Sequence, residues 1–261
     1  MSDEKLILYN KDEHGVATLT LNRPDKLNAF TPEMIARWTE LLAQVGADES
    51  VKVLVLTGAG KAFCSGGDAG AMEDFAKQTA REQKDMLWRK VHQIPLTLER
   101  MDKPVIAAIN GVARGAGLDM ALMCDIRIMA ESATLAESYI NMGLITGNGG
   151  TYFLPRLIGL DRALEIFWTG RAVTSQEAER IGMVTRVVPD DQVITHTYEL
   201  AHKIASQPFE AVRAYKRTTY QGLDMSLASH LDMISSHQVV LRQSPEHLVK
   251  VQAFLKRKGK E

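Results

Sequence analysis

Short apolar runs recur along the first two-thirds of the chain and predict the strands of a sheet. Val16–Leu21 alternates apolar and polar residues, whereas residues 51–57 and Val105–Ile109 are almost continuously apolar. Alternation predicts a strand that buries one face, and a short continuous run bounded by turn residues predicts a strand buried on both faces. Continuous runs are typical of parallel strands that helices cover on both sides.

Helical patterns lie between these strands and take over at the end of the chain. Thr31 has the residue type of a helix N-cap, and apolar residues follow it at helical spacing. Residues 72–100 are mostly polar and helical in character, with a break expected at Pro95. We expect an α/β core over residues 1–190 and a purely helical region over residues 191–261.

Two of the predicted strands run directly into glycine-rich turns. Val105–Ile109 is followed by three glycines within residues 111–117 and then by good helix formers, and the strand at residues 51–57 leads into the glycine-rich residues 58–68. The first N–H groups of a helix have no partner within it, and glycine lets another atom approach the backbone closely. Two such turns together could hold one developing negative charge.

Asp119 lies three residues after Ala116, in the second of these turns. Residues three apart share a helix face, so Asp119 can point toward whatever the N–H of Ala116 holds. A carboxylate there could move a proton while backbone donors hold the charge. The residues alone leave a second interpretation open, because the helix dipole also favours an aspartate in the first turn.

Composition and charge narrow the class of protein. The 261 residues are 45% hydrophobic and 24% charged, which suits a globular chain with a sizeable core. A net charge of −1 gives no attraction to nucleic acid or to an anionic membrane, and the apolar stretches are too short to span one. The first ten residues lack an apolar segment of signal-peptide length, and the two cysteines are far apart. We therefore expect a cytoplasmic protein with reduced cysteines.

The motifs of several common activities are missing from the sequence. The seven histidines and two cysteines form no metal-binding motif. Lys61 follows Gly60 without the rest of a P-loop, and Met120 takes the place of the third glycine of a dinucleotide fingerprint. Phe63 stands where a nucleophile elbow needs a glycine. We expect no metal, no cofactor and no serine triad.

Several segments resemble the crotonase family, the enoyl-CoA hydratase/isomerase superfamily. The matching stretches are NRPDKLNAF at 22–30, GKAFCSGGD at 60–68, KPVIAAINGVARGAGLDMALMCDIRIMA at 103–130, GLITGNGGTYFLPRLIGLDRALEIFWTG at 143–170 and AERIGMV at 178–184. They occur in the family's order and cover most of the first two-thirds of the chain. The remaining third is similar chiefly in being helical.

This resemblance implies an α/β fold built as a spiral of ββα repeats, with a helical C-terminal trimerisation region and assembly as a homotrimer or a dimer of trimers. It implies an acyl-CoA substrate whose thioester oxygen binds two backbone N–H groups, by position those of Gly67 and Ala116. It also implies a larger set of residues that contact coenzyme A: Lys26, Leu27, Ala62, Ser65, Gly67, Asp68, Ala69 and Gly115.

The acids of this chain depart from the pattern of the family's hydratases. Asp119 stands where hydratases have one glutamate, and Tyr139 stands where they have the second. A tyrosine does not replace a carboxylate base at neutral pH, because its ordinary pKa is about 10. Glu137 substitutes for the missing acid if the loop is shifted, and is otherwise an ordinary exposed glutamate. Gly147 takes the position where the family's isomerases often carry an acid.

The leading hypothesis is an enoyl-CoA hydratase, a lyase of fatty acid metabolism that adds water to a 2-enoyl-CoA with Asp119 and Glu137 as its acid–base pair. One alternative is an isomerase in which Asp119 alone moves a proton. Another is a non-catalytic coenzyme A-binding homologue, since the second glutamate is missing. The sequence leaves the acyl chain open, with Trp88, Tyr139 and Phe153 as candidates to line its pocket.

Overall fold

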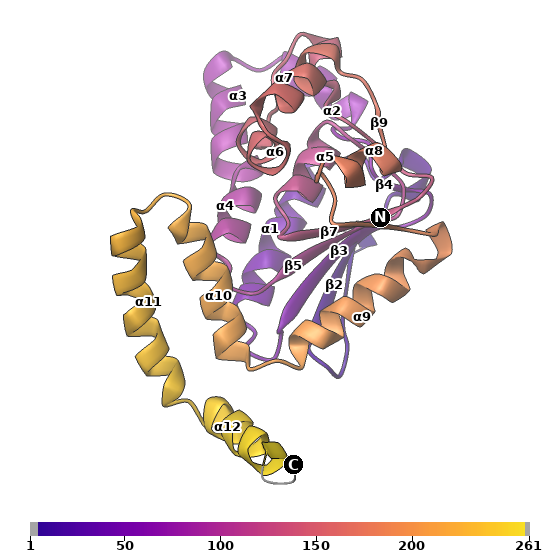
Figure 1. The fold of residues 1–261 in the computed structure, drawn as a ribbon. Helices are drawn as coiled ribbons and strands as arrows, with labels where there is room; N and C mark the ends of the chain where they lie inside the picture. The colour runs from indigo at the N-terminus through magenta and orange to yellow at the C-terminus, as the bar shows by residue number, and fades with distance from the viewer. Residues whose placement is uncertain (1–4, 259–261) are drawn as a thin grey trace.

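Two sheets form the centre of the computed structural model, which describes residues 5–258 except for the side chains of Ala69, Met72 and Ala76 (Figure 1). The strands are β1 (Ile7–Lys11), β2 (Val16–Leu21), β3 (Val53–Gly58), β4 (Ala62–Cys64), β5 (Val105–Ile109), β6 (Val112–Arg114), β7 (Ile126–Ala130), β8 (Thr134–Ala136), β9 (Val173–Thr174) and β10 (Arg186–Val188). The larger sheet has six strands in the order β1-β2-β3-β5-β7-β10, and the smaller has four in the order β4-β6-β8-β9. All pairs are parallel except β1 with β2 and β8 with β9.

The helices cover these sheets and form the end of the chain. They are α1 (Pro32–Ala47), α2 (Ala69–Ala76), α3 (Ala80–Met86), α4 (Gln93–Arg100), α5 (Ala116–Leu122), α6 (Gly150–Ile158), α7 (Leu160–Thr169), α8 (Ser175–Arg180), α9 (Val193–Ala205), α10 (Phe209–Gly222), α11 (Leu227–Arg242) and α12 (Pro245–Lys258), and a π-helical turn, Leu87–Val91, joins α3 to α4. Among the described residues, no helix is long and apolar enough to cross a membrane.

A strand of the larger sheet is followed three times by a strand of the smaller sheet and then by a helix. β3 leads into β4 and α2, β5 into β6 and α5, and β7 into β8 and α6. β3, β5 and β7 are neighbours, as are β4, β6 and β8. This is the spiral of ββα units that the sequence implied. Because neighbouring parallel strands end at the same edge of a sheet, it places equivalent turns side by side.

The structure confirms the predicted N-cap at Thr31 but not the predicted helix break at Pro95. Thr31 caps α1 by accepting a hydrogen bond of 3.3 Å from the N–H of Met34. The predicted break at Pro95 is wrong, because the irregular segment is the π-helical turn and α4 begins at Gln93. Pro95 therefore lies in the first turn of α4, where a missing N–H costs no helical hydrogen bond.

A buried lysine closes the end of α1. Lys103 is 1% exposed, and its Nζ donates hydrogen bonds of 2.7, 3.1 and 2.7 Å to the carbonyl oxygens of Val45, Gly46 and Asp48. These carbonyls lie at the C-terminal end of the helix, where they lack helical partners and where the helix dipole favours a cation. Burial lowers the pKa of Lys103.

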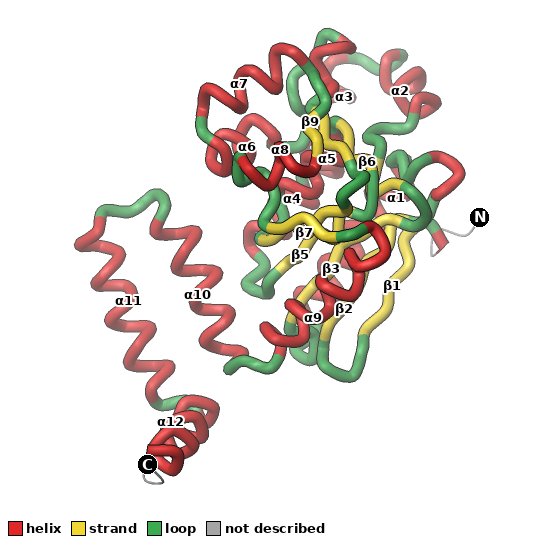
Figure 2. The backbone as a smooth tube through the Cα atoms, turned by 45° about the vertical axis from the view of Figure 1, so that its right-hand side comes forward, coloured by secondary structure: helices red, strands yellow, loops and turns green. Residues whose placement is uncertain are grey.

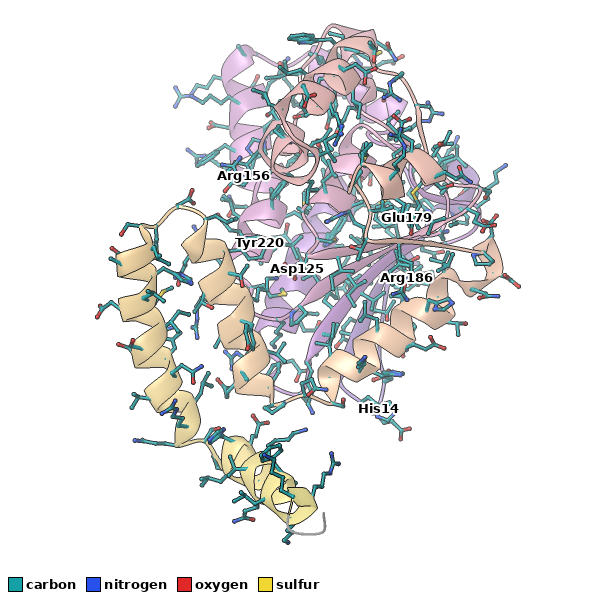
Figure 3. All side chains as sticks on the ribbon, viewed as in Figure 1. His14, Asp125, Arg156, Glu179, Arg186 and Tyr220 are labelled. Carbon is teal, nitrogen blue, oxygen red and sulfur yellow. The ribbon has the colours of Figure 1, made fainter. Side chains whose placement is uncertain are left out.

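The helices after residue 190 differ in how they attach to the core. α9 packs over β2, β3, β5 and β7 and buries Val193 and Ala201, so packing against the larger sheet continues past residue 190. α10 is fastened by Asp125, which pairs with Lys216 at 2.8 Å and accepts a hydrogen bond of 2.8 Å from the hydroxyl of Tyr220 (Figure 3). By contrast, α11 and α12 bury no side chain, and they extend away from the sheets (Figures 1 and 2).

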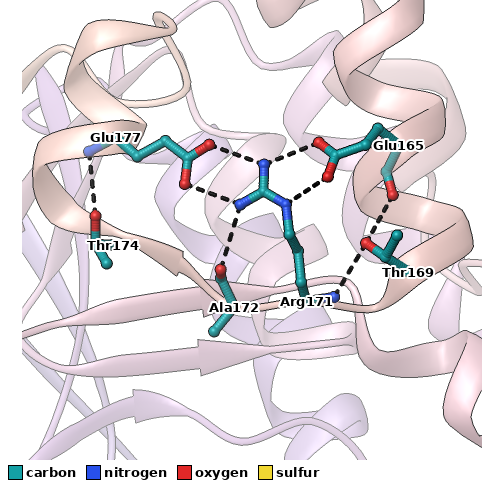
Figure 4. A network of polar contacts seen from close by, with 6 residues as sticks. All are labelled: Glu165, Thr169, Arg171, Ala172, Thr174 and Glu177. Atoms are coloured by element: carbon teal, nitrogen blue, oxygen red, sulfur yellow. Dashed lines mark hydrogen bonds and ion pairs between the residues drawn. The ribbon is translucent and has the colours of Figure 1, made fainter.

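An arginine joins α7 to α8 on the surface (Figure 4). Arg171 contacts Glu165 through Nε and Nη2 at 2.6 and 2.8 Å, and contacts Glu177 through Nη1 and Nη2 at 2.8 Å each. The two carboxylates raise the pKa of Arg171, and the guanidinium lowers the pKa of both glutamates. This cluster fixes the connection between α7 and α8.

Candidate active site

Two buried carboxyl groups meet at the start of α6. Asp119 lies in the first turn of α5, and Glu137 directly follows β8. Both residues are 0% exposed. A Cβ atom placed on Gly150 would overlap Oδ1 of Asp119 and lie only 2.8 Å from Oε1 of Glu137. Both carboxyl groups therefore face the backbone of the same glycine, and the interpretation of Glu137 as an exposed residue is wrong.

One oxygen of Asp119 is held by two donors. Oδ2 accepts a hydrogen bond of 2.7 Å from the hydroxyl of Tyr139 and one of 3.1 Å from the N–H of Asn148. Oδ1 of Asp119 and both oxygens of Glu137 are buried and lack a hydrogen-bond partner in the described part of the chain. Two ionised carboxylates cannot donate to each other, so a proton on one of them is needed to satisfy these oxygens.

The surroundings raise the pKa of both acids, and that of Glu137 more. Burial raises both pKa values because it disfavours the charged form. The negative charge of Asp119 raises the pKa of Glu137 further, whereas the hydrogen bonds from Tyr139 and Asn148 oppose the rise at Asp119. Both effects favour the proton on Glu137 and the negative charge on Asp119.

Two backbone N–H groups lie on adjacent loops near these acids. Gly66 has a φ of +103°, and a Cβ atom placed there would lie 3.1 Å from the carbonyl oxygen of Arg114 and 3.7 Å from the nitrogen of Ala116. The loop of Gly66 and Gly67 is thus in contact with the first turn of α5. Within residues 5–258, neither the N–H of Gly67 nor that of Ala116 donates a hydrogen bond.

The loop before α1 is held by a residue that sequence reasoning missed. Asn28 is buried with a φ of +57°, and its Nδ2 donates to the carbonyl oxygens of Ala59 and Ala62 at 2.9 and 2.7 Å. This fixes Lys26 and Leu27, both expected at the coenzyme A entrance, on the surface beside the turn between β3 and β4. The residue type was the one signal that the sequence offered, because asparagine adopts the left-handed conformation more readily than most residues.

The other residues expected to contact coenzyme A have mixed environments. Ala62 is buried within β4, and Ser65 is partly buried. Asp68 caps α2 through a hydrogen bond of 2.9 Å from the N–H of Gly70 and pairs with Arg23 at 3.0 Å. Gly115 has a φ of +49° and donates its N–H to the carbonyl oxygen of Ala136 at 2.8 Å. The side chain of Ala69 lies outside the described set.

A cavity of about 300 Å³ lies beside the acid pair. Trp88 and Phe153, two of the three candidates for the acyl pocket, line this cavity, whereas Tyr139 does not line it and instead contacts Asp119. His92 also lines the cavity, and its Nε2 lies 2.7 Å from the carbonyl oxygen of Gly147. Sequence reasoning gave His92 no role, since nothing in the sequence indicates that the 147–149 turn packs against the start of α4.

The architecture identifies the class of this protein: the spiral of ββα units matches known crotonase-fold structures. The crystal structure of an enoyl-CoA hydratase from Bacillus anthracis superimposes with a TM-score of 0.91 at 34% identity, over 97% of this chain and 96% of that one. The family model described as enoyl-CoA hydratase/isomerase matches residues 11–259. The chain belongs to the enoyl-CoA hydratase/isomerase family.

Relatives with different activities share this similarity. A probable enoyl-CoA hydratase of Mycobacterium bovis is 40% identical over 246 residues, which are 92% of this chain and 86% of that protein. A 1,2-epoxyphenylacetyl-CoA isomerase of Escherichia coli is 36% identical over 247 residues, which are 95% of this chain and 94% of that protein. Family membership thus covers both hydration and isomerisation, and the choice between them depends on the acids of this site.

Proposed function

We propose that this protein is an enoyl-CoA hydratase that uses Asp119 and Glu137 as a pair. The observation that carries the proposal is the approach of both carboxyl groups to Gly150, and the raised pKa of Glu137 beside Asp119 supports it. Hydration needs one group that takes a proton from water and one that gives a proton to carbon. A charged Asp119 beside a protonated Glu137 supplies both before the substrate arrives.

In the proposed reaction, the thioester oxygen accepts hydrogen bonds from the N–H groups of Gly67 and Ala116. Asp119 takes a proton from water as the oxygen of that water bonds to Cβ, and the electron pair of the double bond moves toward the thioester to give an enolate. The two amides stabilise the negative oxygen. Glu137 then gives its proton to Cα, which completes the addition of water. Transfer of a proton from Asp119 to Glu137 restores the starting state.

The test of this proposal is hydration of crotonyl-CoA, measured as the decrease in absorbance of the enoyl thioester. We expect Asp119→Asn and Glu137→Gln each to lower kcat by at least about a hundredfold, in line with the typical contribution of a general acid or base. Glu131→Gln, at an exposed position between β7 and β8, is the matched control. Full activity of Asp119→Asn would overturn the mechanism.

Isomerisation by Asp119 alone is the second candidate, and the position of Tyr139 favours it. Tyr139 stands where hydratases have an acid and holds Asp119 in place, so that one carboxylate could carry a proton between two carbons. Incubation of a 3-enoyl-CoA in deuterium oxide distinguishes the two reactions. An isomerase converts the 3-enoyl-CoA to the 2-enoyl-CoA and keeps this activity in Glu137→Gln. A hydratase leaves the 3-enoyl-CoA unchanged and hydrates only the 2-enoyl-CoA, an activity that Glu137→Gln loses.

The third candidate function is that of a homologue that binds coenzyme A thioesters without catalysis. Tight binding of acyl-CoA with no turnover on either 2-enoyl-CoA or 3-enoyl-CoA would support it.

The proposal also includes assembly as a homotrimer or a dimer of trimers, which the exposed apolar side chains of Leu231, Val240 and Phe254 on α11 and α12 support. Light scattering after gel filtration measures that mass directly.

A further inference from the structure

The cavity beside the acid pair reaches from the catalytic turn to the C-terminal part of the chain. Asn148, whose N–H donates to Asp119, borders it together with Gly149. Lys216 and Tyr220 of α10 border it as well. A group that lies in this cavity is therefore separated from the carboxyl group of Asp119 by one residue, Asn148.

The walls between these two borders are apolar and aromatic. They are formed by Trp88, Leu96, Leu98, Met123, Tyr152 and Phe153. The rings are held edge to face, Trp88 against His92 with centroids 5.9 Å apart and Tyr152 against Phe153 with centroids 5.2 Å apart. Such walls favour an apolar guest, because burial of hydrocarbon is the main gain they offer.

A polar cluster borders the cavity on the side of α10. Asp125 pairs with Lys216 and accepts a hydrogen bond from the hydroxyl of Tyr220. Lys216 and Tyr220 lie one turn apart on α10, and Figure 3 labels Asp125 and Tyr220. Lys216 also donates to the carbonyl oxygen of Lys103 at 2.9 Å, so the charges are satisfied within the protein. The same three residues border a second cavity of about 450 Å³, from which they separate the first.

We propose that this cavity binds the acyl group of the thioester and selects an apolar acyl group of medium length. This inference rests on the proposed acyl-CoA function and names the substrate class within it. A volume of about 300 Å³ holds roughly ten non-hydrogen atoms at about 30 Å³ each. With the reacting carbons outside it, the cavity suits acyl groups of up to about twelve carbons.

The charged residues at the α10 border of the cavity add a second element of selectivity. Asp125 and Lys216 neutralise each other, and Glu99 adds a further carboxylate to the border. An acyl group that ends in a carboxylate would meet this border without a free cation. We therefore expect a terminal carboxylate to be rejected.

Binding of saturated acyl-CoA thioesters, measured by calorimetry, tests the inference independently of catalysis. Butyryl-, decanoyl-, phenylbutyryl- and palmitoyl-CoA are compared, with the mono-CoA thioester of decanedioic acid as the charged probe. Decanoyl-CoA should bind on the order of a hundredfold more tightly than butyryl-CoA. Phenylbutyryl-CoA should approach decanoyl-CoA, palmitoyl-CoA should gain nothing over it, and the charged probe should bind at least about tenfold more weakly.

Two variants should move this preference in opposite directions. Leu96→Trp fills the cavity and should reduce the decanoyl-to-butyryl affinity ratio by about tenfold. Tyr220→Ala removes part of the border between the two cavities and should let palmitoyl-CoA bind more tightly than decanoyl-CoA. Leu8→Trp, at an exposed position of β1, is the matched control for the added ring.

The outcomes separate this inference from the proposed function. Failure of every acyl-CoA to bind overturns the function itself. Equal affinities for butyryl-CoA and decanoyl-CoA would overturn only the assignment of the cavity. An unchanged decanoyl-to-butyryl affinity ratio in Leu96→Trp would do the same, provided that the variant has a normal circular dichroism spectrum. Should Leu96→Trp fail to fold, the length preference of Tyr220→Ala decides in the same way.

Discussion

The hydroxyl of Tyr139 donates a hydrogen bond of 2.7 Å to Oδ2 of Asp119. Tyr139 stands where related hydratases have an acid, and burial raises its own pKa further above the ordinary value. It therefore stays protonated and acts as a donor to the aspartate. In the proposed mechanism the second acid of the pair is Glu137, two residues earlier in the chain.

Tyr139→Phe should weaken the proposed base and move its titration. Removal of the hydroxyl takes away a donor that favours the charged form of Asp119, so the pKa of Asp119 rises. Because the base must be ionised, the acidic limb of kcat/KM against pH should move up by about one pH unit. Tyr215→Phe, at an exposed position of α10, should leave the profile unchanged. An identical acidic limb in Tyr139→Phe would contradict this role.

Gly150→Ala should abolish activity, whereas Gly46→Ala should not. A methyl group at residue 150 would overlap Oδ1 of Asp119 and crowd Glu137, while a methyl group at residue 46 of α1 meets no atom within 4 Å. We expect a loss of at least about a hundredfold in kcat/KM for the first and a gain in stability of about 0.5 kcal/mol for the second. Enoyl-CoA turnover and thermal melting measure the two effects, and an active Gly150→Ala protein would refute the geometry.

Asp119→Asn should stabilise the protein while it removes catalysis. Burial raises the pKa of Asp119 to about 6 in the folded state, so the folded protein binds a proton more tightly than the unfolded chain does. The stability linked to this proton is present at about pH 4 and is lost as the pH rises through 6. At pH 8 the variant should be more stable by about 2 kcal/mol, or about 5 °C in Tm.

Melting curves between pH 4 and pH 8 measure this difference. Asp224→Asn, in the exposed segment between α10 and α11, is the control and should show no gain. An Asp119→Asn protein whose advantage grows toward low pH would contradict the sign of the shift.

Lys103→Met should destabilise the fold without a direct effect on the site. The substitution leaves the carbonyl oxygens of Val45, Gly46 and Asp48 without their donor, at a cost of about 3 kcal/mol in the free energy of unfolding. Denaturant unfolding measures it, and Lys77→Met, whose side chain is exposed, is the control. Equal unfolding midpoints for the two variants would show that the buried ammonium contributes little.

Periodicity predicted the longer elements of the fold well. Strands β2 and β5 follow the predicted residues from end to end, because each has enough positions for a period of two or a continuous run to show. The strands of the smaller sheet have two or three residues each. A segment of that length shows no period, so this sheet emerged only with the three-dimensional arrangement.

The candidate site divides in the same way between local and long-range information. Asp119 was identified from its spacing to Ala116, which is a local property of one helix turn. The burial of Glu137 depends on the packing of α6 against the loop after β8. The border of the cavity at Lys216 depends on α10, which lies far from Asp119 in the sequence. No pattern within a short window contains those contacts.

Helices α11 and α12 bury no side chain within one chain, although helices of this length are marginal in water without tertiary packing. In the proposed assembly, association between copies of the chain would supply part of the free energy that orders them, and association depends on protein concentration. Dilution should lower the helical circular dichroism signal while the sheets and α1 to α10 remain folded, so heating of a dilute sample should give two separate transitions.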